Sequence, residues 1–241
     1  LYIADEDGAG IDELFRVLFS NTGFSEKLHP DFSAGNNVTG FEVAPNSASV
    51  VYVADQDIDG IFELYRTVIA GLVNSKLSGT ITGNEDVTVF AMIPDGSGVV
   101  YIADQDTNDV FELYRTLFAG GKEKLNPALV AGRNVSTVQV AADSTGVVYL
   151  ADQDTDGVNE VYRTVFGVTG STRLNPVGFI AGQNIVAYTV SPDSSSVIYR
   201  ANQDTVGNVE LFKTFFASPG ASTKLNSALD VGEDVTNFAV R

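Results

Sequence analysis

"VYLADQDTDGVNEVYR", residues 148–163, places an acidic turn between two runs of strand-forming residues. Val and Tyr are enriched in β-strands, whereas Asp and Gly favour tight turns. Variants of this stretch begin at residues 1, 51, 100 and 198. The first acid or amide of each turn lies 48 to 50 residues after the previous one, at Asp5, Asp55, Asp104, Asp152 and Asn202. Repetition at this period indicates a fold built from one repeated structural unit.

Each copy contains four short segments with strand composition. In the second copy these are residues 38–44, 49–54, 62–69 and 76–82, separated by Gly, Asn, Asp, Pro and Ser. Apolar residues do not recur in them at the spacing of a helix. Four strands in each repeat are typical of a β-propeller. The sequence therefore predicts an all-β propeller of five four-stranded blades, with the aromatic residues packed in the core between blades.

The two ends of the sequence predict how the blades close into a ring. The chain begins with a second-strand motif, at residues 1–7, and finishes with a first-strand motif, at residues 234–241. Pairing the last strand with the first three would complete a blade and remove the exposed sheet edges. Residues 1–241 are therefore predicted to form a single β-propeller domain, and a piece of a longer repeat array is the alternative.

Composition narrows the classes of partner. The chain has 14 basic and 31 acidic residues and a net charge of -17. This balance argues against nucleic acid, which is bound through clustered Lys and Arg side chains. The longest apolar runs are too short to span a membrane. We expect a soluble protein in an extracellular or periplasmic location, with a protein or glycan as its ligand.

Two pairs of stretches resemble a known family of repeats. "SPDSSSVIYRANQD" followed by "VELF", and "IPDGSGVVYIADQD" followed by "FELY", are similar to the blades of TolB-like (WD40-like) β-propellers. Those blades have a Ser-Pro-Asp-Gly turn, an aliphatic-aromatic strand, an acidic turn and a Glu-aliphatic-Tyr strand. The resemblance covers all five repeats and implies the same fold, although the family usually has six blades. Such repeats serve unrelated roles, so the resemblance implies little about function.

The acidic turns have the composition of calcium loops. Calcium binds six to eight oxygen atoms, and alternating carboxylates folded around a glycine can supply them. The turns also resemble the Asp-x-Asp-x-Asp-Gly calcium loops of integrin-type propellers, with Glu in place of the final Asp. Repeats two and four keep acids at positions 1, 3, 5 and 9 of the turn, so the predicted Ca²⁺ ligands are Asp55, Asp57, Asp59, Glu63, Asp152, Asp154, Asp156 and Glu160.

The other three repeats keep only part of this pattern. Their weaker candidate ligands are Asp5, Asp7, Glu13, Asp104, Asp106, Glu112, Asp204 and Glu210. The alternative is that the acids only build the turn, because Asp and Asn side chains accept hydrogen bonds from backbone N–H groups. In that case the recurrent Glu would bind a neighbouring backbone or a nearby cation such as Arg66, Arg115 or Arg163.

The residues needed for common catalytic sites are scarce. The chain has no Cys and one His, and His29 occupies a loop position that is Asn in sister repeats. A Ser-His-Asp or Cys-His site is therefore not expected. We predict a non-enzymatic, calcium-binding propeller that acts as a binding or structural scaffold. The first alternative is a metal-free propeller that binds proteins and is a fragment of a larger protein. The third possibility is a glycoside hydrolase with two catalytic carboxylates.

Overall fold

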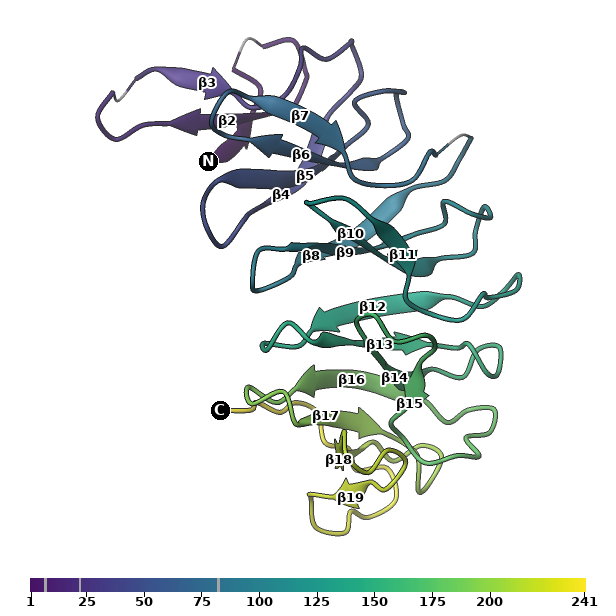
Figure 1. Ribbon diagram of the computed structural model, residues 1–241. Coiled ribbons are helices and arrows are strands. Elements are labelled where there is room, and N and C mark those ends of the chain that lie inside the picture. Colours follow the sequence, from purple (N-terminus) through teal and green to yellow (C-terminus); the bar gives the residue numbers. More distant parts are fainter. Residues whose placement is uncertain (7, 22, 82) are drawn as a thin grey trace. The chain divides into compact units, whose positions relative to one another are not determined.

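The structure is a computed structural model that describes residues 1–6, 8–21, 23–81 and 83–241 (Figure 1). Within these ranges the chain forms nineteen strands and no helix. The strands make five sheets, one for each sequence repeat, and strands that follow one another in the sequence are neighbours in the sheet. The predicted all-β class is therefore confirmed.

The sheets differ in the number of strands. The first has three strands, β1 (Tyr2–Ala4), β2 (Glu13–Val17) and β3 (Ser25–Lys27). The second consists of β4 (Val38–Val43), β5 (Ser49–Ala54), β6 (Glu63–Val68) and β7 (Val73–Lys76). The third consists of β8 (Val87–Met92), β9 (Gly98–Ala103), β10 (Glu112–Leu117) and β11 (Lys122–Lys124). The fourth consists of β12 (Val135–Val140), β13 (Gly146–Ala151), β14 (Glu160–Val165) and β15 (Thr172–Arg173). The fifth consists of β16 (Ile185–Val190), β17 (Ser196–Ala201), β18 (Glu210–Phe215) and β19 (Thr223–Lys224).

The chain divides into two compact units. One contains residues 1–88 and 103–108, and the other contains residues 89–102 and 109–241. Residues 234–241, all of which the structure describes, form no strand. Closure of the ring through this segment, and a single domain over residues 1–241, stay predictions.

Three of the sheets have a fully buried strand in their centre. All six residues of β5, β9 and β13 are buried. A tyrosine in this strand faces an aromatic residue on the next strand, as where Tyr149 lies opposite Tyr162 with 5.6 Å between ring centres. Stacked aromatic pairs contribute about 0.5–1.5 kcal/mol beyond the area that they bury. The aromatic core predicted from the sequence is confirmed for these residues, whereas Phe19 is 97% exposed.

A threonine hydroxyl connects neighbouring repeats. The Thr67 hydroxyl donates to the carbonyl of Leu28 at 2.5 Å, and the Thr164 hydroxyl donates to the carbonyl of Leu125 at 2.7 Å. Thr214 occupies the same position in repeat five, but its hydroxyl is fully buried and has no hydrogen-bond partner. The same residue type therefore stabilises two of these junctions and carries an unsatisfied polar group at a third.

Valine substitutions at these threonines should have opposite consequences. Thr164→Val is expected to lower the free energy of unfolding by about 1–2 kcal/mol, because the Leu125 carbonyl loses its donor. Thr214→Val is expected to leave it unchanged or raise it by up to about 1 kcal/mol, because the hydroxyl that is removed has no partner. Urea unfolding of both variants measures the difference. Equal destabilisation by both substitutions would contradict this account.

Candidate functional site

The first acid of each turn is held by backbone donors. Asp152 accepts the N–H of Asn134 at 2.6 Å through Oδ1 and the N–H of Gly157 at 3.0 Å through Oδ2. Asp55 makes the equivalent pair of bonds, to the N–H groups of Asn37 and Gly60. Gly157 and Gly60 have positive φ, the conformation that a side chain would disfavour. The acid at position 1 therefore closes the turn on itself and ties it to the preceding loop.

The remaining repeats use the first position in related ways. Asp5 accepts the N–H groups of Ala9 and Gly10 at 3.0 and 2.9 Å. Asp104 accepts the N–H of Asp86 at 2.6 Å, and Asn202 accepts that of Asn184 at the same distance. An amide can replace the carboxylate at Asn202 because the position needs a hydrogen-bond acceptor and not a charge.

The glutamate at position 9 is buried beside a cation on the last strand of the sheet. Glu160 accepts a hydrogen bond from Arg173 at 3.0 Å and from the Tyr162 hydroxyl at 2.9 Å. Only 2% of its side chain is exposed. Ion pairs of this kind recur in all five repeats, as Glu13–Lys27, Glu63–Lys76, Glu112–Lys124, Glu160–Arg173 and Glu210–Lys224.

The aspartate at position 3 shares the same cation in repeats two, four and five. Asp57 pairs with Lys76 at 2.6 Å, Asp154 with Arg173 at 3.1 Å and Asp204 with Lys224 at 2.8 Å. These aspartate side chains are 45–48% exposed. Each cation therefore contacts a buried glutamate on one side and a surface aspartate on the other. The hydrogen bond to Asp204, and to a smaller extent the one to Glu210, raises the pKa of Lys224, so this side chain stays charged.

The acids at position 5 of the turns in repeats two and four, Asp59 and Asp156, lie beside glycines of the preceding loops. Asp59 is exposed beside Gly35, where a Cβ atom would come within 3.0 Å of the Asp59 carboxylate. Asp156 is exposed beside Gly132, and Asp106 is also exposed. Asp7 lies outside the described residues. Among the described residues, no group of three or more Asp, Glu, His or Cys side chains is arranged to hold a metal ion. Calcium binding stays a prediction.

The sequence-based alternative is correct about the turns but names the wrong cation for Glu112. Backbone donors do hold the first acid, and Glu112 Oε1 accepts the N–H of Leu129 at 3.0 Å. The cation beside Glu112 is Lys124, from the last strand, whereas Arg115 pairs with Glu123 at 2.5 Å. Arg163 lies over the Phe216 ring, with 4.4 Å from its guanidinium carbon to the ring centre. Strand register, which sequence spacing does not fix, decides which cation the glutamate meets.

His29 performs the role of the asparagine that it replaces. Its Nε2 accepts the N–H of Leu14 at 3.1 Å, and its Nδ1 donates to the Pro30 carbonyl at 2.7 Å. Asn175 makes the same two bonds, accepting from Val161 and donating to Pro176, both at 3.0 Å. Both ring nitrogens are therefore engaged by the main chain, and the structural role predicted for His29 is confirmed.

Folding stability is expected to depend on His29 below neutral pH. Burial lowers the pKa of His29 from its ordinary value of 6.5, because charging it would desolvate a cation and remove the acceptor for Leu14. The unfolded chain then binds the proton more readily than the folded chain. The contribution of neutral His29 to the free energy of unfolding is therefore complete above about pH 6.5, and it decreases as the pH falls from about 6.5 to the lower pKa of the folded state. His29→Asn should keep both bonds and remove this loss. Urea midpoints at about pH 7.5 and about pH 5 test it, and the same pH dependence in both proteins would contradict it.

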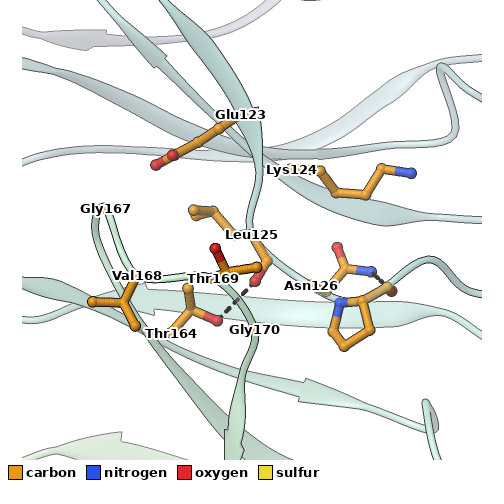
Figure 2. Close-up of a pocket in the computed structure, with 10 residues that line it drawn as sticks. Glu123, Lys124, Leu125, Asn126, Thr164, Gly167, Val168, Thr169 and Gly170 are labelled. Atoms are coloured by element: carbon orange, nitrogen blue, oxygen red, sulfur yellow. Dashed lines mark hydrogen bonds between the residues drawn. The ribbon is translucent and has the colours of Figure 1, made fainter.

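A cavity that no sequence signal indicates lies between repeats three and four. Its volume is about 370 Å³, and it is lined by residues 123–127, Thr164 and residues 167–170. Figure 2 shows the Thr164 hydroxyl directed at the main chain of Leu125, below the side chain of Glu123. Cavities of at least about 300 Å³ are large enough for small ligands or peptide segments.

No protein-family model matches the sequence, and no curated protein matches it. Solved structures do match. A TolB from Acinetobacter baumannii is 14% identical with a TM-score of 0.49, covering 86% of this chain and 47% of that one. A putative TolB from Agrobacterium tumefaciens is 13% identical with a TM-score of 0.52, covering 88% of this chain and 73% of that one. Dipeptidyl peptidase 4 from Porphyromonas gingivalis is 12% identical with a TM-score of 0.65, covering 87% of this chain and 36% of that one.

The similarities to the Agrobacterium TolB and to the peptidase define the fold. The chain spans about half the length of the Acinetobacter TolB and about a third of the peptidase. At such low identity the likeness to the Agrobacterium TolB and to the peptidase concerns architecture alone. The TolB-like β-propeller fold that the sequence resembles is therefore confirmed, and each sheet is a blade of this type. Within the described residues, no helix has the length and apolarity to cross a membrane.

Proposed function

Because the chain has the fold of TolB-like β-propellers, we propose that it is a non-enzymatic scaffold that binds other proteins. One observation supports this proposal above all. The buried glutamate and its cation recur equivalently in every repeat. Catalysis by two carboxylates needs one pair of acids in distinct environments, so that one is protonated and the other ionised. Five equivalent ion pairs serve to join strands.

The chemistry of the single histidine also supports a scaffold. A catalytic histidine must exchange a proton with a nucleophile, and here both nitrogens of His29 are engaged by the main chain. An exported location, extracellular or periplasmic, belongs to the proposal and is supported by the strongly acidic composition, which suits a soluble protein.

Hydrolase assays test the scaffold role directly. We expect no turnover of chromogenic glycosides or of peptide substrates. Glu160→Gln is the matched variant, because it removes a buried carboxylate but keeps a hydrogen-bonding side chain of the same length. Turnover that the variant loses while it remains folded would show that the protein is an enzyme and would overturn the proposal.

We propose that Lys and Arg side chains neutralise and stabilise the acidic turns. The competing proposal is that calcium ions do so. The supporting observation is that Asp57 and Glu63, two of the predicted ligands, already share Lys76. A Ca²⁺ ion would have to displace this cation or bind beside it.

Thermal unfolding with EDTA, with millimolar Ca²⁺ and with millimolar Mg²⁺ is therefore expected to give the same melting temperature. Calcium sites of ordinary extracellular affinity, about 10⁻⁴ to 10⁻³ M, would each add about 1 kcal/mol at a few millimolar ion. A melting temperature that rises with Ca²⁺ but not with Mg²⁺ would support the calcium proposal instead. In that case Asp59→Asn and Asp156→Asn, which leave the ion pairs intact, should abolish the rise.

A further inference from the structure

The junction between repeats three and four and the junction between repeats four and five belong to one compact unit. They differ in which group lies beside the carbonyl of the leucine position that the repeats share, Leu125 in one and Leu174 in the other. At the junction between repeats four and five, the turn of residues 217–221 contacts Leu174, the residue after the last strand of repeat four. Gly220 donates its N–H to the Leu174 carbonyl at 2.9 Å. Pro219 lies near Leu174 and Phe216, with which it lines a cavity of about 220 Å³. A Pro-Gly turn therefore occupies the place beside the Leu174 carbonyl.

The junction between repeats three and four leaves the equivalent place open. Leu125 corresponds to Leu174, and the turn of residues 167–170 corresponds to the Pro-Gly turn. From Phe166 to Arg173 the chain is one residue shorter than from Phe216 to Lys224. The bond to Leu125 comes from the Thr164 hydroxyl, and the cavity of about 370 Å³ remains beside it.

The open cavity has the chemistry of an uncharged peptide site. A carbonyl oxygen has two lone pairs, so the Leu125 carbonyl can accept a second N–H beside the Thr164 hydroxyl. The charged groups on the rim have partners of opposite sign: Glu123 pairs with Arg115, and Lys124 pairs with Glu112. Figure 2 shows the Lys124 side chain extending away from Val168 and the 167–170 turn. A ligand therefore needs a backbone donor, and it needs no net charge.

We propose that this cavity binds a Pro-Gly turn of a partner protein, with the glycine N–H on the Leu125 carbonyl and the proline ring in the cavity. The occupant is inferred from the neighbouring junction, where the chain supplies the same group to itself through Pro219 and Gly220. The proposal rests on the proposed scaffold function and specifies one binding site for it. A turn with preset backbone angles loses less conformational freedom on binding than a flexible segment would.

The test uses the capped peptide acetyl-Ser-Pro-Gly-Ala-amide, whose sequence is that of residues 218–221. It is titrated into the whole ¹⁵N-labelled chain and followed by amide chemical shifts. We expect saturable shifts centred on Leu125, Thr169 and Gly170, with a dissociation constant between about 0.1 and about 10 mM for so small a ligand. Absence of saturation in this range, or shifts centred on other residues, would overturn the assignment of this cavity.

Two matched controls isolate the interaction. The same peptide with N-methylglycine in place of glycine lacks the donor and should bind about fivefold more weakly, the usual effect of one hydrogen bond. Replacing residues 167–171 by the six residues Ala217–Ser222 should let repeat four fill its own cavity and abolish binding. Equal affinity for both peptides would contradict the proposal. Unchanged peptide binding by the variant chain that carries the replacement turn would also contradict it. These results are independent of the hydrolase assays, which test the scaffold function itself.

Discussion

Arg173→Leu is expected to destabilise the folded chain by about 3–5 kcal/mol, because it leaves a buried carboxylate without its cation. Arg173 pairs with Glu160 at 3.0 Å, and the Glu160 side chain is 2% exposed. Tyr162 and Asn175 would still donate hydrogen bonds to that carboxylate, but neither carries a charge. Urea unfolding at neutral pH measures the change in the free energy of unfolding.

Two control variants separate burial from simple loss of an ion pair. Asp154→Asn removes the other partner of Arg173, and this partner is 48% exposed. Its cost should stay below about 1 kcal/mol, as for surface ion pairs in general. Adding Glu160→Gln to Arg173→Leu should recover part of the loss, since no charge is then left buried. If Arg173→Leu costs no more than Asp154→Asn, the buried pair is not a main stabilising contact.

Tyr149→Ala alone is expected to lower the free energy of unfolding by about 3–5 kcal/mol, because it opens a cavity in the core. Tyr149 is completely buried and lies opposite Tyr162, at 5.6 Å between ring centres. It belongs to a cluster that includes Leu113 and Val147. Loss of the ring removes both the buried area and the stacked partner of Tyr162.

The Tyr149→Phe variant is the control for the ring itself. It keeps the stack and removes the hydrogen bond from the hydroxyl to Gln153 Oε1, which measures 2.9 Å. A loss of about 1 kcal/mol is expected for that bond. Comparable losses for the Phe and Ala variants in urea unfolding would show that the hydroxyl, and not packing, is the dominant contribution.

The sequence was sufficient to predict the repeats, most of the strands and the tyrosine core. The fourth strand of the second repeat is an exception, because it lies at Val73–Lys76 and not at the predicted residues 76–82. The period of 48–50 residues and the Val-Tyr runs determine where strands form, because they depend only on local composition and on repetition. The role of His29 was also predictable, since sister repeats show which residue type the loop needs.

The contacts of the acidic turns were not predictable in the same way. Carboxylates spaced around a glycine can bind calcium or accept hydrogen bonds from N–H groups, and both uses require the same residues. Which cation Glu112 meets depends on strand pairing that brings Lys124 opposite Tyr114. The cavity beside Leu125 lies next to a turn that is one residue shorter than its counterpart in repeat five, and such a difference has no signature in composition.

The hairpin register also bears on how quickly the protein folds. Tyr52 pairs with Tyr65, only 13 positions later, and the Thr164 hydroxyl reaches back 39 positions to Leu125. Contacts that are short in sequence close small loops, so the entropy lost before each favourable contact forms is small. In repeat proteins such nearest-neighbour contacts allow folding to start in one repeat and spread to the next. We therefore expect folding faster than that of β-sandwiches of similar length, in which distant strands must find each other first.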